Sequence, residues 1–171
     1  MRIALFSDIH ANRQAFEACL AADAAGAEQF AVLGDIVGYG ADPAWCVQQV
    51  QHLQDHGAVV VQGNHDAAVA ATGPDLSMHS VAGQAVNWTR MQLDDAQRRW
   101  LGHLPLECTD ADRYYVHADA SAPERWRYVE DTDDARTHLA ACTARLSFCG
   151  HVHRPALYSQ IPGDARINRF A

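Results

Sequence analysis

The chain has 171 residues, of which 49% are apolar and 20% charged, values typical of a soluble globular protein rather than a disordered or membrane-embedded one. Its 13 basic residues are all arginines and face 21 acidic residues, so the formal net charge is −8. The lack of lysine excludes lysine-dependent P-loop, Schiff-base and pyridoxal chemistry, and the acidic balance argues against stable binding of duplex nucleic acid.

Short apolar runs of the β type alternate with helical patterns along the chain. In chain order, we expect strand 2–6, helix 12–26, strand 29–33, helix 43–56, strand 58–61, helices within 67–104, paired strands 106–109 and 114–116, helix 131–141, strand 146–149 and strand 156–160. This alternation predicts an α/β layered fold. Because no linker or internal repeat divides the chain, we expect one domain over 1–171, with a helical insert at 67–104.

Cysteine usage and hydropathy indicate a cytoplasmic protein. The five cysteines are scattered and form no C-x-x-C pair, which is typical of buried thiols in a reducing compartment. The first apolar run, 3–6, is too short for the core of a signal peptide, and no run approaches the roughly 18 residues of a membrane span. We therefore expect a cytoplasmic location and no membrane association.

Residues that commonly bind metals follow most of the predicted strands. Three strands run into a glycine and then such a residue, at Gly34-Asp35, Gly63-Asn64-His65 and Gly150-His151-Val152-His153. Glycine allows a sharp turn and a close approach of the backbone, and ligands collect at the carboxyl ends of parallel strands. With the ends of two further strands, the sequence predicts a rim that brings eight side chains together: Asp8, His10, Asp35, Asn64, His65, His117, His151 and His153.

The types and spacing of these residues favour a transition-metal site. In Asp8-x-His10 and His151-x-His153, the paired side chains would face the same way on an extended backbone. Carboxylates, an amide and imidazoles suit Mn, Fe, Zn, Co or Ni better than Ca or Mg, and so many ligands fit two ions that share a carboxylate. Each histidine alone would more readily be structural, so the prediction depends on their joint occurrence at strand ends.

Five motifs together resemble the signature of the calcineurin-like metallophosphoesterase family: Asp8-x-His10, Gly34-Asp35-Ile36-Val37-Gly38, Gly63-Asn64-His65-Asp66, His117 within Val-His-Ala, and Gly150-His151-Val152-His153. They are most similar to a small bacterial and archaeal phosphodiesterase-like branch that carries Ser-Asp-Ile-His-Ala-Asn and Gly-Asp-Ile-Val-Gly-Tyr-Gly. The resemblance covers nearly the whole chain. It implies a four-layer α/β/β/α sandwich, a dinuclear site for divalent transition metals and phosphoester hydrolysis.

The resemblance also implies a role for each site residue. The first ion would be held by Asp8, His10, Asp35 and His153. Asp35 would bridge to a second ion completed by Asn64, His117 and His151. Two such ions lower the pKa of a shared water, so a metal-bridged hydroxide would attack phosphorus while His65 protonates or stabilises the leaving oxygen.

One departure from related enzymes bears on the substrate. The phosphoprotein-phosphatase branch carries an arginine in its second motif, where this chain has Val37-Gly38-Tyr39. Without that clamp on a phosphoryl group, a small phosphodiester or nucleotide-like substrate is favoured over phosphoserine. Asn12, Tyr39 and Arg154 adjoin ligand motifs and are candidate phosphate contacts.

Other functions on this fold stay open at this point. A phosphomonoesterase or a diadenosine-polyphosphate-type hydrolase would use the same site, whereas a non-catalytic binding module is disfavoured because His65 and every ligand are present. Relatives usually continue through more strands after the last histidine motif. We therefore expect a second sheet shortened at the C-terminus, whose exposed edge leaves pairing into a homo-oligomer open.

Overall fold

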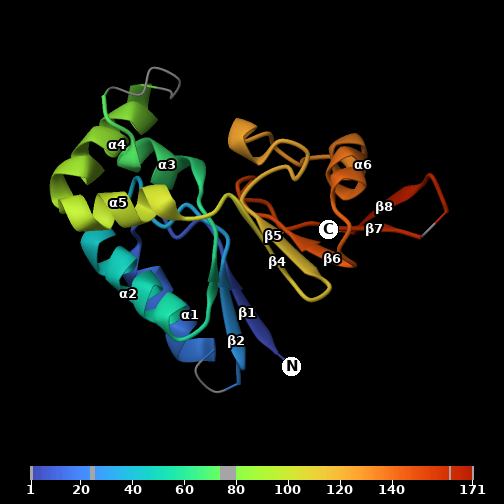
Figure 1. The fold of residues 1–171 in the computed structure, drawn as a ribbon, viewed down its shortest axis with the longest axis horizontal. Helices are drawn as coiled ribbons and strands as arrows, with labels where there is room; N and C mark the ends of the chain where they lie inside the picture. The colour runs from blue at the N-terminus through green and yellow to red at the C-terminus, as the bar shows by residue number, and fades with distance from the viewer. Residues whose placement is uncertain (1, 24–25, 74–79, 162, 171) are drawn as a thin grey trace.

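The computed structural model describes residues 2–23, 26–73, 80–161 and 163–170. The first sheet is parallel and lies in the first half of the chain. Its strand order is β1 (Ile3–Phe6), β2 (Gln29–Val32) and β3 (Val59–Val60). Its crossover helices are α1 (Arg13–Asp23) and α2 (Pro43–Asp55), which lie on the same side of the sheet in Figure 1. These elements follow the predicted ones, with no end shifted by more than three residues.

Alternation along the strands gives the first sheet two apolar faces. On one face Phe6 and Val32 pack against Phe16 of α1 and Val47 of α2 in the main core. The other face carries Ala31, which belongs to a second apolar cluster. Both faces are therefore covered, which explains why these strands read as continuous apolar runs.

The second sheet covers that second face. It contains β4 (Glu107–Asp110), β5 (Arg113–Val116) and β6 (Leu146–Phe148), with β4 antiparallel and β6 parallel to β5. Tyr115 of β5 is fully buried against Leu33 and Val61. On the far side, His138 of α6 (Thr132–Ala141) contacts the Ser147 hydroxyl of β6 at 2.7 Å. The result is the predicted order of helix, sheet, sheet and helix (Figure 1).

The helical insert begins earlier than predicted. Its described helices are α3 (Asn64–Ala70), α4 (Ser80–Gln92) and α5 (Asp95–His103), and positions 74–79 of the predicted insert lie outside the described residues. Helix α3 starts at Asn64 because the Asp66 carboxylate accepts the Gly63 N–H at 3.0 Å, which caps the first turn. Two candidate site residues, Asn64 and His65, thus lie in a helix and not in a loop.

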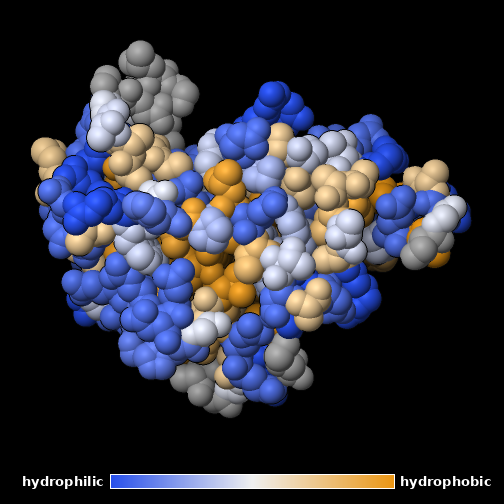
Figure 2. All heavy atoms as spheres, viewed as in Figure 1, coloured by the Kyte–Doolittle hydropathy of each residue, from blue (hydrophilic) through white to orange (hydrophobic). Residues whose placement is uncertain are grey.

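Two elements were not predicted: the short 3₁₀ helix η1 (Pro123–Arg125) and strand β8 (Ile167–Phe170). Strand β8 pairs antiparallel with β7 (Leu157–Gln160) in a separate two-stranded sheet beside α6 (Figure 1). In the same view, Figure 2 shows apolar surface gathered at the centre and mostly hydrophilic surface over the helices. None of the helices in the described part of the chain is long and apolar enough to span a bilayer.

Candidate metal centre

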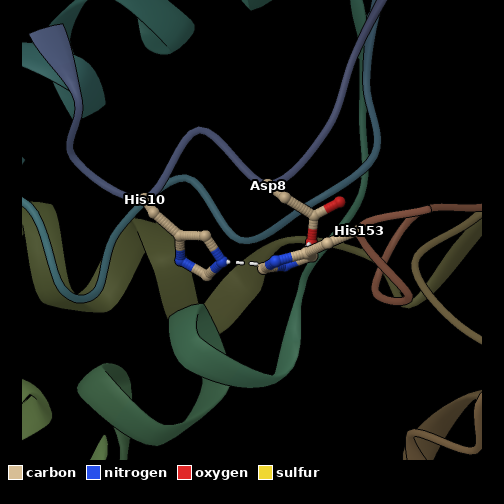
Figure 3. A group of neighbouring side chains, drawn as sticks. All are labelled: Asp8, His10 and His153. Atoms are coloured by element: carbon tan, nitrogen blue, oxygen red, sulfur yellow. Dashed lines mark hydrogen bonds and ion pairs between the residues drawn. The ribbon is translucent and has the colours of Figure 1, made fainter. Parts of the chain in front are cut away.

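The loops that leave five strands converge at one end of the two sheets. Three groups of potential ligands form there, and within each group one ligand atom per residue lies within 4.8 Å of the others. The groups are Asp8, His10 and His153; His10, Asp35 and His65; and Asp35, His117 and His151. Figure 3 shows the first group, in which side chains from distant parts of the sequence point toward one another. With Asn64 beside His117, all eight predicted residues come together.

The backbone at these residues differs from the predicted one. Both Asp-x-His and His-x-His pairs were expected on extended backbone, yet Asp8, His10, His151 and His153 have φ between 47° and 68°. The chain turns immediately after each strand in this left-handed region, which disfavours side chains other than glycine. Such conformations persist only where the surroundings enforce them, as here, where the His10 N–H donates to Asp35 O at 2.9 Å.

Two glycines allow the loops that carry the ligands to pack directly against each other. A Cβ at Gly63 would overlap the backbone nitrogen and Oδ1 of Asp35. A Cβ at Gly150 would overlap Ser7 Oγ and stand 2.7 Å from Asp8 Oδ2. The sequence predicted a close approach of the backbone at these glycines, and the structure shows that the approach is of one ligand loop to another.

Asp35 lies between two of the groups. Its Oδ2 is 3.7 Å from His10 Nε2 and 3.3 Å from His117 Nε2, while Oδ1 accepts the His65 N–H at 2.9 Å. The carboxylate is 1% exposed. One buried carboxylate thus faces imidazoles on both sides, which is the position of a shared ligand.

Asp8 anchors the outer end of the site. Its two oxygens accept the His151 N–H at 3.2 and 3.1 Å, and Ser7 Oγ donates to Oδ2 at 2.6 Å. Oδ1 also lies 3.1 Å from His153 Nε2, which is in turn 3.2 Å from His10 Nε2. The first group is therefore tied to both sheets, and His153 is its exposed member.

Backbone carbonyls fix the orientation of three imidazoles. His10 Nδ1, His117 Nδ1 and His151 Nε2 lie 3.2, 2.6 and 2.9 Å from the carbonyl oxygens of Val37, Leu33 and Trp126. Because a carbonyl can only accept, these three nitrogens carry the hydrogens. In a neutral ring, the other nitrogen then presents a lone pair to the site, the arrangement that holds metal-binding histidines in place.

Lone pairs on the histidine nitrogens that face the site repel one another unless a positive charge lies between them. His117 Nε2 lies 3.2 Å from His151 Nδ1 and 3.2 Å from Asn64 Oδ1, so three acceptor atoms would face one another if the His117 ring were neutral. Acceptors at this distance repel unless a proton or a cation lies among them. The donor set, two carboxylates, an amide and imidazoles, fits a borderline divalent metal better than calcium or magnesium.

The pKa directions agree with a site built for cations. Burial raises the pKa of Asp35, but the hydrogen bond and charge of His117 outweigh burial and bring it below its ordinary value. Burial lowers the pKa of His117, but Asp35 overcomes this and raises it. Burial lowers the pKa of His10, His65 and His151, which keeps these rings neutral and able to bind a metal near pH 7.

A pocket of about 490 Å³ opens onto the site. It contains predicted residues from both sheets as well as Ala82 of α4. Among the candidate phosphate contacts, Tyr39 and Arg154 line the pocket. Asn12 instead caps α1, since its Oδ1 accepts the Ala15 N–H at 3.1 Å.

Three residues at the site were not predicted: Tyr128 and Glu130, which belong to no recognised motif, and Asp66, which lies in the Gly63-Asn64-His65-Asp66 motif but was given no role. Tyr128 and Glu130 line the pocket from the loop before α6, which follows no strand. Asp66 is fully buried and accepts the N–H groups of Gly63 at 3.0 Å and Val37 at 3.2 Å, so it fixes two ligand loops. Burial raises the pKa of Asp66 to about 7, and the negative charge of Asp35 acts in the same direction.

Comparison with known proteins places this geometry in one family. The model of the calcineurin-like phosphoesterase superfamily domain matches residues 1–168. An uncharacterized protein of Methanocaldococcus jannaschii is 32% identical over 165 residues, covering 92% of this chain and 65% of that protein. The chain therefore spans about two thirds of the length of this curated relative.

Solved structures show the same fold. A metallophosphoesterase from Sphaerobacter thermophilus is 37% identical, with a TM-score of 0.79, over 92% of this chain and 63% of that one. A hypothetical protein from Pyrococcus horikoshii OT3 has a TM-score of 0.70 at 15% identity, over 98% and 86% of the two chains. A putative diadenosine tetraphosphatase has a TM-score of 0.54 at 25% identity, over 68% and 50%.

Proposed function

The chain belongs to the calcineurin-like phosphoesterase superfamily, and we propose that it is a metal-dependent phosphoesterase that hydrolyses a small or nucleotide-like phosphodiester. The observation that carries the proposal is the position of Asp35. Its buried carboxylate lies between His10 and His117, at the junction of two groups of potential ligands. A carboxylate shared in this way is what two neighbouring cations require.

We assign the ligands from the family resemblance, and the observed groups support this assignment because His10 and Asp35 each belong to two of them. Asp8, His10, Asp35 and His153 would hold one ion, and Asp35, Asn64, His117 and His151 the other. We propose manganese, iron, zinc, nickel or cobalt, because the donors mix nitrogen and oxygen. Divalent ions bound here would supply a water of lowered pKa and neutralise charge that develops on the phosphate.

His65 is the residue placed to act on the leaving group. It lines the pocket, its backbone N–H is held by Asp35, and its ring centroid is 5.0 Å from that of His10. Its Nδ1 is buried without a hydrogen-bond partner among the described residues, so no protein group fixes its proton. We propose that the His65 imidazole donates a proton or a hydrogen bond to the leaving oxygen.

The pocket favours a diester over a phosphoprotein. At positions 37–39, where phosphoprotein phosphatases carry an arginine, the chain has no basic residue. Arg154 lines the pocket without a hydrogen-bond or ion-pair partner among the described residues, and we propose that it contacts an outer phosphate oxygen. A non-catalytic role is disfavoured because His65 and most of the proposed ligands line one pocket, with Asp8 and His117 adjoining them in the groups of potential ligands.

A substrate and metal panel tests this function. The chelated protein, reloaded separately with Mn, Ni, Zn or Mg, is assayed with bis(p-nitrophenyl) phosphate and p-nitrophenyl phosphate. We expect a transition metal to restore hydrolysis, with a higher kcat/KM for the diester. Higher kcat/KM for the monoester would show a phosphomonoesterase, and no hydrolysis with any metal would contradict the proposal.

A second candidate is a diadenosine-polyphosphate-type hydrolase. Two observations favour it: the likeness to the putative diadenosine tetraphosphatase, and Arg154, which has no partner in the described part of the chain and would contact a further phosphate. Diadenosine tetraphosphate in the same panel separates the two candidates. If it exceeds the simple diester in kcat/KM and Arg154→Ala removes that advantage, the second candidate is correct.

A further inference from the structure

Two tyrosines stand at the pocket with their rings largely open to solvent. Tyr39 and Tyr128 are 54% and 53% exposed, and both line the pocket that contains the metal centre. They come from opposite halves of the molecule, Tyr39 from the loop after β2 and Tyr128 from the loop before α6. Neither hydroxyl has a hydrogen-bond partner among the described residues. Large rings are usually buried at least in part for their apolar area, so a pair left open at a site points to a ligand.

Each tyrosine ring packs against a histidine of the site. The Tyr128 ring stacks on His151, with centroids 4.3 Å apart and an angle of 7° between the planes. The centroid of the Tyr39 ring lies 4.6 Å from that of His65 and 5.0 Å from that of His10. Tyr128 therefore adjoins the ligand group of Asp35, His117 and His151, and Tyr39 adjoins His65, the proposed acid.

The backbone holds both rings in place before any substrate arrives. The loop of Tyr128 is fixed on both sides, since Trp126 O accepts from the His151 ring at 2.9 Å and Arg127 O accepts the Asp119 N–H at 3.1 Å. Tyr39 has a φ of 62°, an unfavourable conformation for an aromatic residue. The surrounding loop must enforce that conformation, and such strain collects at binding sites.

We propose that Tyr39 and Tyr128 are specificity-determining residues that bind a planar aromatic group of the substrate, such as a nucleobase. This inference rests on the proposed phosphoesterase function and narrows its substrate class to phosphodiesters with an aromatic substituent. The phosphate lies at the metal centre, and the ring packs against the exposed tyrosine faces. Stacking on aromatic side chains tolerates any base, because every base has a π-face.

Paired substrates with one leaving group test the proposal. Both p-nitrophenyl phenyl phosphate and p-nitrophenyl methyl phosphate release p-nitrophenolate, so the preference for the phenyl ester reports on the retained group alone. We expect Tyr39→Leu and Tyr128→Leu each to reduce the ratio of kcat/KM values, phenyl over methyl, by about tenfold, mainly through KM. The Tyr→Phe variants keep the ring and should keep the ratio. Phe170→Leu, an exposed ring outside the pocket, should leave it unchanged.

A binding measurement separates this proposal from the proposed function. Calorimetry with the metal-loaded protein compares phenyl phosphate with methyl phosphate, and the tighter binding of phenyl phosphate should disappear in the double leucine variant. If neither ester is hydrolysed, the proposed function fails, yet this difference in Kd still tests the tyrosines. An equal loss for both esters, or an unchanged ratio, would overturn the proposal and leave Tyr39 and Tyr128 as positioning residues for His65 and His151.

Discussion

At the scale of single residues, the proposed chemistry depends on which histidine ring nitrogens have a fixed hydrogen-bond partner and which do not. Backbone carbonyls hold the outer nitrogens of His10, His117 and His151, so their inner nitrogens are committed to the site. Asp35 then faces two of those nitrogens. His65 is held only through its backbone and neighbouring rings, which leaves its imidazole free to exchange a proton. Metal binding and proton transfer are therefore separable by substitution.

Asp35→Ala should abolish metal binding together with activity. Asp35 belongs to two of the three ligand groups and is the proposed bridge between the ions, so its removal would leave both metal sites incomplete. Because even a residue behind a ligand contributes about 10–100-fold to metal affinity or activity, losing this ligand should cost more than about 100-fold. Elemental analysis and the diester assay measure both effects. Asp112→Ala, at an exposed carboxylate paired with Arg145, is the control; two ions retained in Asp35→Ala would refute the bridging role.

His65→Gln should separate turnover from metal binding. Glutamine keeps a polar side chain beside Asp35 but cannot transfer a proton, so kcat should fall by about 10²–10⁴-fold while the metal content stays at the wild-type level. His56→Gln, at an exposed histidine in a helix C-cap, serves as the control. Wild-type turnover in His65→Gln would show that the imidazole does not act on the leaving group.

At the scale of elements, most of the fold could be predicted from local signals. The strands of the first sheet read as apolar runs, Pro43 marks the start of α2, and ligand residues follow five of the strands. The early start of α3 could not be predicted, since it depends on a hydrogen bond made by Asp66. Strand β8 was missed because its pattern is short and polar, and Tyr128 because only tertiary packing brings its loop to His151.

The packing of α6 on the second sheet should depend on pH through His138. Its ring is buried, accepts the Ala120 N–H at Nδ1 at 3.1 Å and contacts Ser147 Oγ at 2.7 Å. Burial lowers the pKa of His138 below 6.5, opposed in part by the charge of Asp119. Below pH 6.5 the unfolded chain therefore takes up a proton that the folded chain does not, so this stabilisation is present at higher pH and is lost as pH falls.

Urea unfolding of wild type and His138→Gln from pH 8 to 5 measures this effect. The wild type should be more stable than the variant at pH 8, and the difference in unfolding free energy should shrink below pH 6.5. Other buried histidines titrate in both proteins, so taking the difference removes their shared contribution. A difference that stays constant or grows toward pH 5 would contradict the assignment.

At the scale of the whole molecule, the site joins the two sheets. Asp8, His10 and Asp35 extend from the first sheet, whereas His117 and the His151–His153 loop extend from the second. Among the described residues, a small apolar cluster around Tyr115 lies between the sheets, while the main core packs against the other face of the first sheet. Cations at the shared end would therefore link two layers that are otherwise joined by modest apolar contact.

Removing the metal should consequently destabilise the whole fold and not the site alone. At a free metal concentration about 100 times Kd, binding to the folded state adds about 2.7 kcal/mol, or roughly 5–10 °C in Tm for a chain of this length. Scanning calorimetry with chelator and then with added Mn or Zn measures the shift. Asp35→Ala should show no metal-dependent shift, because its ligand groups are incomplete. If chelation strips the ions, as elemental analysis records, and the wild-type Tm does not move, the ions do not hold the two sheets together.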